Sequence, residues 1–164
     1  MSKQEQPDQD KQQKDQTGTE EAPKAIYLAD YQPPGYTTQQ TELHFDIRDG
    51  QTTVTATLQV ARQDAAASQM ELLGEELSLL SVELDGRALA NNEYALSDHS
   101  LTLFNLDEEH EVRIVTQICP EKNTALEGLY RSSSMYCTQC EAEGFRKITY
   151  YQDRPDVLSK FKTT

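Results

Sequence analysis

The sequence predicts an all-β fold, built from antiparallel strands in sandwiched or curved sheets, with one short helix near the C-terminal end. Three observations carry this prediction: short runs in which apolar and polar residues alternate, turn dipeptides between these runs, and a spacing of roughly ten residues from one run to the next. At 164 residues the chain has room for about one domain with a modest core.

The clearest hairpin is predicted over residues 42–62. Its first strand alternates apolar with polar side chains, and Asp49-Gly50 is a dipeptide typical of hairpin turns. The return strand places its apolar residues on one face and its threonines on the other, as β-propensity favours. The apolar residues of the two strands are Leu43, Phe45, Ile47, Val54, Ala56, Leu58 and Val60.

Later runs predict further strands. The segment 64–80 is rich in Ala, Glu and Leu and would allow a helix, but Gly74 interrupts it, and we favour a short strand with a loop. The other strand predictions cover residues 81–89, two short runs within 93–106, residues 111–120 and residues 147–151.

The predicted helix covers residues 153–161. Asp153 is a suitable N-cap and Pro155 suits the first turn. Val157, Leu158 and Phe161 would form its apolar side.

The N-terminal composition differs from that of the remaining chain. Residues 1–24 contain six glutamines and ten charged residues, so we predict a disordered polar tail there and a folded domain over residues 25–164. The formal net charge of −13 argues against nucleic acid as a partner. No run approaches the ~18 apolar residues of a membrane span, so we expect no membrane partner. The tail also lacks the apolar region of a secretory signal, and the expected location is cytoplasmic.

The three cysteines give a weak metal or redox signal. Cys137-x-x-Cys140 is a single pair, whereas a structural zinc site takes four ligands. Cys119 is the third cysteine, and an odd set without framework spacing favours a reducing compartment. A thioredoxin-like pair belongs to a βαβ unit, which this strand-rich region does not predict.

The histidines offer no catalytic motif. His110-Glu111 begins like the zinc-protease motif H-E-x-x-H, but its fifth position is Ile114 and the run alternates like a strand. We therefore expect His44, His99 and His110 to be surface residues, no metal bound by this chain, and no catalytic residue within it.

Gln139 and Glu141 form the candidate binding pair. On an extended segment, residues two apart project from the same face. A carboxylate and an amide oxygen aimed at one point would accept hydrogen bonds from a substrate ammonium group. Solvated side chains in a polar stretch are the competing interpretation, and composition alone favours it.

A family resemblance changes this balance. The run 123–157 resembles the N-terminal domain of bacterial aminopeptidase N, the alanyl aminopeptidase group of zinc metallopeptidases. The matching patterns are Asn-x-x-Leu-x-Gly-Leu-Tyr, then Thr-Gln-x-Glu, then an Arg and Tyr-Tyr-x-Asp-Arg-Pro-Asp. The earlier strands match more loosely, so the resemblance covers residues 27–164, and the tail has no counterpart.

The resemblance implies a saddle-shaped, largely antiparallel domain that lies over a catalytic domain of the same polypeptide. Its Gln-x-Glu loop would project into the active site. Glu141 would bind the α-ammonium of a peptide substrate with a free N-terminus, and Gln139 would line the first side-chain pocket. Glu143 does not match the motif and is expected to be structural or solvated.

The family's zinc site, H-E-x-x-H with a further Glu, and its G-x-M-E-N segment have no counterpart here. The resemblance therefore implies a fragment, truncated at its C-terminal end and inactive alone, whose zinc ligands lie outside these 164 residues. Two alternatives remain open: a non-catalytic β-domain that acts as a binding module, and a small cysteine-ligated zinc protein.

Overall fold

The computed structural model describes residues 27–164. The described residues fall into two units, residues 27–32 and residues 33–164. Of the first unit, the described part holds one turn of 3-10 helix, η1 (Leu28–Asp30). The predicted polar tail, residues 1–24, lies outside the described residues.

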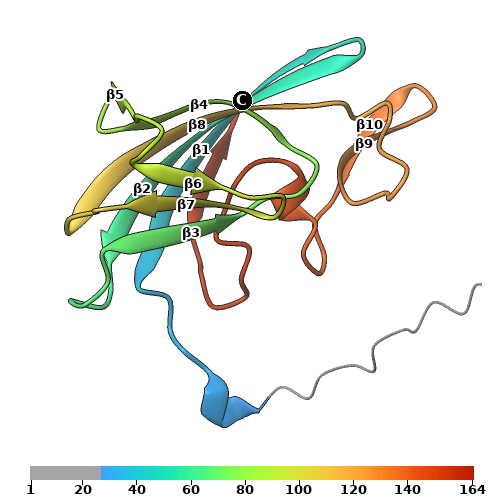
Figure 1. Ribbon diagram of the computed structural model, residues 1–164. Helices are drawn as coiled ribbons and strands as arrows, with labels where there is room; N and C mark the ends of the chain where they lie inside the picture. Colours follow the sequence, from blue (N-terminus) through green and yellow to red (C-terminus); the bar gives the residue numbers. More distant parts are fainter. Residues whose placement is uncertain (1–26) are drawn as a thin grey trace, which may run out of the picture. The chain divides into compact units, whose positions relative to one another are not determined.

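The regular structure of the second unit is almost entirely β-strand, which confirms the all-β prediction (Figure 1). Its helical element is η2 (Phe145–Lys147), again one 3-10 turn. The strands are β1 (Tyr36–Arg48), β2 (Gln51–Arg62), β3 (Gln69–Leu73), β4 (Ser78–Leu84), β5 (Arg87–Ala88), β6 (Tyr94–Leu96), β7 (Ser100–Phe104), β8 (Glu109–Ile118), β9 (Gly128–Ser132), β10 (Met135–Gln139) and β11 (Lys160–Thr163).

The largest sheet has six strands in the order β11-β1-β2-β8-β4-β5. The predicted hairpin belongs to this sheet, with β1 and β2 paired antiparallel from Tyr36↔Arg62 to Arg48↔Gln51. A register shift between Thr38 and Gln40 marks a bulge in β1. Strand β11 pairs parallel with β1, so this sheet is mixed rather than wholly antiparallel.

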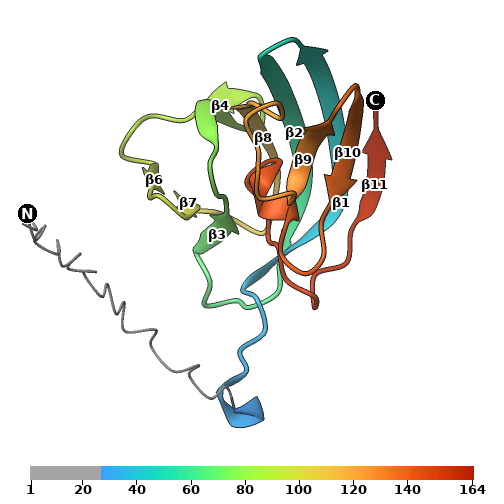
Figure 2. The same cartoon turned by 90° about the vertical axis from the view of Figure 1, so that its right-hand side faces the viewer.

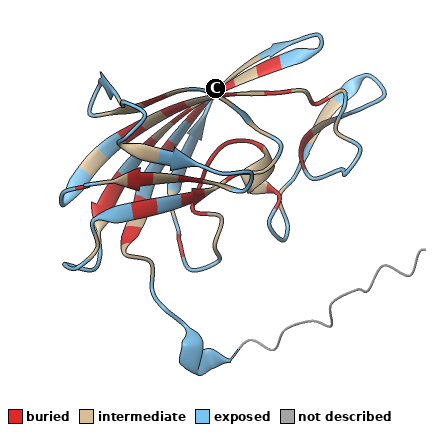
Figure 3. Cartoon of the chain, viewed as in Figure 1, coloured by how far each residue is buried: buried red, intermediate tan, exposed pale blue. Residues whose placement is uncertain are grey.

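A second sheet, β3-β7-β6, lies opposite the first, as the views in Figures 1 and 2 both show. The inward side chains of the two sheets form one apolar cluster, and buried residues alternate with more exposed ones along β2, β3, β7 and β8 (Figure 3). Fully buried members come from both sheets: Val54, Ala56, Leu58, Leu72, Leu101, Leu103, Val112 and Ile114. The apolar face predicted for the return strand is buried, whereas Ile47, on the apolar face predicted for the first strand, is 44% exposed.

Strands β9 and β10 form a separate two-stranded hairpin (Figure 2). It lies between β8 and the long irregular segment that leads to β11. This hairpin and the segment after it carry the candidate site.

The predicted helix over residues 153–161 is wrong. Only a turn forms near Pro155, and the chain then enters β11. Asp153 was expected to cap the helix. Its carboxylate instead accepts hydrogen bonds from Arg146. Leu158, expected on the apolar side, is 87% exposed. Pairing with the distant strand β1 overrides the local helical preference.

The predicted strand over residues 147–151 is also wrong, apart from one isolated bridge between Leu73 and Tyr151. Four consecutive side chains, from Ile148 to Tyr151, are buried, and a strand on the surface of a sheet would alternate instead. The segment is an irregular chain that fills the core next to β3. The short strand expected within 64–80 is confirmed as β3, and the two within 93–106 as β6 and β7.

Candidate functional site

Gln139 and Glu141 lie at the end of the β9–β10 hairpin. Gln139 is the last residue of β10 and pairs with Gly128 of β9. Glu141 lies beyond the strand, in the turn 141–144, and the peptide bond after it is cis. We expected both residues on one extended segment, but only Gln139 belongs to a strand. Both side chains are exposed, and the Gln139 Nε2 donates a hydrogen bond to the Glu141 carbonyl oxygen at 3.3 Å.

The Glu141 carboxylate differs from its acidic neighbours. Among residues 27–164 it makes no hydrogen bond and no ion pair. Glu143, two positions on, contacts Arg146 at 3.3 Å, and Glu127 contacts Lys147 at 3.3 Å. The hairpin thus ends in one carboxylate with free acceptor oxygens, on a backbone that its neighbours hold.

Two glycines set the path of this turn. Gly144 is buried, and a Cβ there would lie 2.5 Å from the Gln139 carbonyl oxygen. Gly128 has a φ of +69°, and a Cβ there would lie 2.8 Å from the Cβ of Lys147. The Gly144 N–H also donates to the Cys140 carbonyl oxygen at 2.9 Å. Backbone segments approach this closely only where side chains are absent, which gives the glycine of the Asn-x-x-Leu-x-Gly-Leu-Tyr pattern a physical role.

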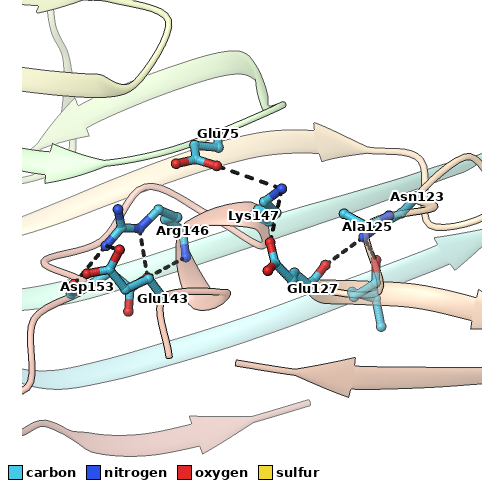
Figure 4. A network of polar contacts seen from close by, with 9 residues as sticks. Glu75, Asn123, Ala125, Glu127, Glu143, Arg146, Lys147 and Asp153 are labelled. Atoms are coloured by element: carbon cyan, nitrogen blue, oxygen red, sulfur yellow. Dashed lines mark hydrogen bonds and ion pairs between the residues drawn. The ribbon is translucent and has the colours of Figure 1, made fainter. Parts of the chain in front are cut away.

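The asparagine of the same pattern organises the loop before β9. The Asn123 side-chain amide donates to the carbonyl oxygens of Glu127 at 2.7 Å and Leu129 at 3.0 Å. Its Oδ1 accepts the Ala125 N–H at 3.1 Å. One side chain thus closes the loop 123–129, which Figure 4 shows beside Lys147.

Arg146 joins the turn to the segment that follows it (Figure 4). Its backbone N–H and its Nε both lie 3.1 Å from the Asp153 Oδ2, and an Nη donates to the Asp153 carbonyl oxygen at 3.2 Å. The side chains of this pair are only 14% and 13% exposed. The Arg146 carbonyl oxygen accepts the Glu75 N–H at 3.0 Å, which links the turn to the loop after β3.

Lys147 makes a second set of ion pairs from the adjacent position. Its Nζ lies 3.3 Å from a Glu127 oxygen and 3.7 Å from a Glu75 oxygen (Figure 4). Burial alone would lower the pKa of Lys147, but the carboxylates of Glu127, Glu76 and Glu75 raise it above its ordinary value. Lys147 is therefore charged and neutralises acidic groups on both sides of the turn.

The hairpin is also tied to the loop before it and to the β1–β2 turn. The Tyr136 hydroxyl donates to a Glu121 oxygen at 2.6 Å, and this bond lowers the pKa of Glu121 and raises that of Tyr136. Arg131 lies over the Tyr136 ring and contacts Asp49 at 3.4 Å. These contacts fix the end of the hairpin at which β9 turns into β10, and Arg146 fixes the chain that follows its other end.

Cys137 and Cys140 lie on the hairpin and just after it, Cys119 lies next to the β1–β2 turn, and none of the three shows the features of a reactive thiol. Cys119, Cys137 and Cys140 are free and partly buried. Burial, with the Asp153 carboxylate, raises the pKa of the Cys140 thiol, whereas a reactive thiolate needs a lowered value. Within residues 27–164, no three His, Cys, Asp or Glu side chains gather as metal ligands.

The sequence led us to expect three surface histidines, and this prediction is wrong for one of them. His44 and His99 are exposed, but the His110 side chain is 9% exposed. Its Nδ1 lies 2.6 Å from Asp85, and its Nε2 accepts the Asp107 N–H at 2.7 Å. Both ring nitrogens are used, so His110 joins two turns and has a structural role.

No helix in the part of the chain described is long and apolar enough to cross a membrane.

The fold and the turn define a class: an all-β domain that presents one unpartnered carboxylate, with an amide beside it, from a braced hairpin. Comparison with known proteins gives the family. Residues 32–164 match the Peptidase M1 N-terminal domain, and the chain belongs to this family.

The chain is similar to curated proteins over most of its length. It is 43% identical over 141 residues to aminopeptidase N of Caulobacter vibrioides and 44% identical over 141 residues to that of Escherichia coli. Each match covers 86% of this chain and 16% of the relative, so the chain spans about a sixth of the length of these proteins.

Solved structures share the fold. Legionella pneumophila aminopeptidase A, in complex with aspartic acid, superposes with a TM-score of 0.77 at 29% identity, covering 83% of this chain and 16% of that one. An M1 zinc metallopeptidase of Deinococcus radiodurans gives a TM-score of 0.66 at 17% identity, covering 79% and 32%, and this likeness shows the fold alone. The predicted family and fold class are thereby confirmed.

Sequence reasoning missed the residues that brace the turn. Ion pairs leave no periodic signal in the sequence. The structure was therefore needed to identify the bracing roles of Arg146, Lys147 and Asp153. The matched motif pattern did include Arg146 and Asp153, and their presence in that pattern was the available signal.

Proposed function

We propose that residues 25–164 form the domain of a zinc aminopeptidase that recognises the N-terminus of a peptide substrate. In this proposal the Glu141 carboxylate binds the α-ammonium group. Gln139 lines the pocket for the first side chain. The zinc ligands and the remaining catalytic groups belong to a catalytic domain elsewhere in the longer polypeptide, which is the partner of this domain.

The observation that carries the proposal is the unpartnered Glu141 carboxylate on a fixed turn. An ammonium group offers three N–H donors, and hydrogen bonds between ionised groups are among the strongest in proteins. The Gln139 side chain is tied to the Glu141 carbonyl oxygen, so the amide and the carboxylate lie on neighbouring parts of one loop. The similarity to aminopeptidases of several bacteria supports the substrate class.

This arrangement explains how release of amino acids would be limited to chain ends. The α-amino group has a pKa of about 7.7–8.0, so most peptides carry an N-terminal charge near neutral pH. An internal peptide bond or an acylated N-terminus presents no charge, and the carboxylate would then lose water without gaining a partner. Breaking such a charged pair costs about 2–5 kcal/mol.

We propose no zinc ligand among the described residues. The cysteine pair and the histidines do not converge in space, and the histidine closest to a carboxylate, His110, is fully occupied by its two turns. Zinc chemistry would be supplied by the catalytic domain, and this domain would contribute recognition. The free cysteines support a reducing, cytoplasmic location.

The test is Glu141→Gln in the complete polypeptide that carries this domain. We expect kcat/KM for an alanyl reporter substrate to fall about 30-fold or more, because loss of the charged pair costs about 2–5 kcal/mol. Zinc content should stay unchanged. Glu71→Gln is the matched control, since Glu71 is an exposed carboxylate on β3, and it should leave turnover unaltered. Near-normal turnover of the Glu141 variant would refute the assignment.

The 164-residue chain alone should release no amino acid from the same substrate, with or without added zinc. The measurement is the absorbance of the released reporter over hours at high protein concentration. Zinc-dependent release by the purified chain would show that this domain holds a complete catalytic site.

A further inference from the structure

We propose that Arg146 is the positioning residue of the Glu141 carboxylate. It would act through the backbone of the turn, without touching substrate. This inference rests on the proposed function, and it assigns a role to an ion pair that the binding of substrate does not itself require.

The contacts of Arg146 reach three separate segments of the chain. Its Nη lies 3.3 Å from the Glu143 carboxylate within the turn. Its backbone N–H, Nε and Nη together take both the side chain and the carbonyl oxygen of Asp153. Its own carbonyl oxygen accepts the Glu75 N–H beyond β3. One residue therefore connects the turn 141–144 to the loop after β3 and to the irregular chain at Asp153.

Burial decides which of these contacts matters. The Arg146 and Asp153 side chains are 14% and 13% exposed, so their pair is shielded from solvent. Glu143 is 67% exposed, and an ion pair so open to water contributes little. The geometry of the turn therefore depends on the Arg146–Asp153 pair far more than on Glu143.

A short series of backbone contacts connects the Arg146–Asp153 pair to Glu141. Gly144 packs against the Gln139 carbonyl and donates its N–H to Cys140, while the Lys147 N–H donates to the Gly144 carbonyl at 3.1 Å. The turn is thus fixed at Gly144 and Arg146 on one side and at Gln139 on the other. Glu141 lies between these points, and its side chain has no contact of its own to hold it.

Arginine is required because its planar fork donates from Nε and Nη at fixed angles. A lysine would keep the charge next to Asp153 but could not make both side-chain contacts. Arg146→Lys therefore changes the geometry of the turn while it avoids an unpaired buried carboxylate, whose destabilising effect would obscure the result.

The test is a double-mutant cycle in the complete polypeptide with the alanyl reporter substrate. Arg146→Lys should lower kcat/KM about tenfold or more in the wild-type background, because small displacements at a binding group are costly. In the Glu141→Gln background it should lower kcat/KM less than about twofold, because the group it positions is gone. Asp153→Asn, which breaks the pair from the other side, should show the same dependence on background.

Arg113→Lys is the matched control. Arg113 pairs with Glu83 at 3.0 Å within the six-stranded sheet, and its replacement should leave kcat/KM unchanged in both backgrounds.

Equal losses for Arg146→Lys in the two backgrounds would mean a general structural role and would overturn this inference alone, as would normal turnover of the single variant. Normal turnover of Glu141→Gln would overturn the proposed function together with this inference. If Arg146→Lys does not fold, Asp153→Asn gives the same decision.

Discussion

The six-stranded sheet and the segment 123–159 are held together by different forces. In the sheet, long strands bury alternate apolar side chains, and β2 and β8 are paired along ten residue pairs. In the segment, one short hairpin and one 3-10 turn are joined by irregular chain, and glycine contacts with partly buried ion pairs fix their positions. Regular structure supports the fold, and individual polar contacts place the site.

This difference has a consequence for tolerance to mutation. Apolar burial is non-directional and spread over many side chains, so its geometry survives modest changes. Ion pairs and close backbone contacts depend on single atoms at fixed distances. We therefore expect substitutions in the sheet to change the free energy of unfolding, and substitutions near the turn to change the position of Glu141.

A buried apolar side chain of the sheet should have a large effect on stability. Leu58 is fully buried on β2, and Leu58→Ala should lower the free energy of unfolding by about 2–5 kcal/mol because it leaves a cavity. Leu158 is 87% exposed in the other region, and Leu158→Ala should stay within about 0.5 kcal/mol. Urea denaturation of both variants measures the contrast. Similar losses for the two leucines would contradict the division into two regions.

A glycine pair separates backbone strain from close contact. Gly50 and Gly128 have φ values of +77° and +69°, but a Cβ at Gly50 meets no atom within 4 Å. Both alanine variants carry the cost of the left-handed conformation, about 1–2 kcal/mol. Gly128→Ala should lose about 1–3 kcal/mol more, because it forces Lys147 and Gly144 to move. Urea denaturation gives both values, and equal losses would show that the contact near the turn is unimportant.

The smallest effect concerns an exposed ion pair at the edge of the sheet. Arg87 donates two hydrogen bonds to Glu93, and with the Ala90 N–H this lowers the pKa of Glu93 to about 2. A carboxyl group with a depressed pKa stabilises the fold above its unfolded value, near 4.5, and this contribution disappears as the pH falls toward 2. The melting temperatures of wild type and Glu93→Gln should therefore differ slightly at pH 7 and converge below pH 4.5. A difference that grows in acid would contradict the assignment.

The same division explains what could be predicted from the sequence. The β1–β2 hairpin follows from local alternation and the Asp49-Gly50 turn, and the apolar face predicted for β2 is buried, although Ile47 near the end of β1 is exposed. The segment 153–161 has helical local preferences, yet it ends in β11, because pairing with a strand more than a hundred residues earlier decides its structure. Long-range pairings leave no trace in a short window.

The candidate site was located by motif resemblance and not by pattern. Gln139 and Glu141 stand in a polar stretch, and nothing in their spacing shows that β10 ends between them. The motif pattern contains both Arg146 and Asp153, but it gives no sign that the two residues pair. They are seven positions apart in a segment without regular structure, and the fold brings them together.

The most direct test is a structure of the complete polypeptide with a bound peptide that has a free N-terminus. We predict a Glu141 carboxylate oxygen about 2.7–2.9 Å from the ammonium nitrogen, with the Arg146–Asp153 pair intact. A Glu141 side chain turned to solvent, with the ammonium group held by other residues, would contradict it.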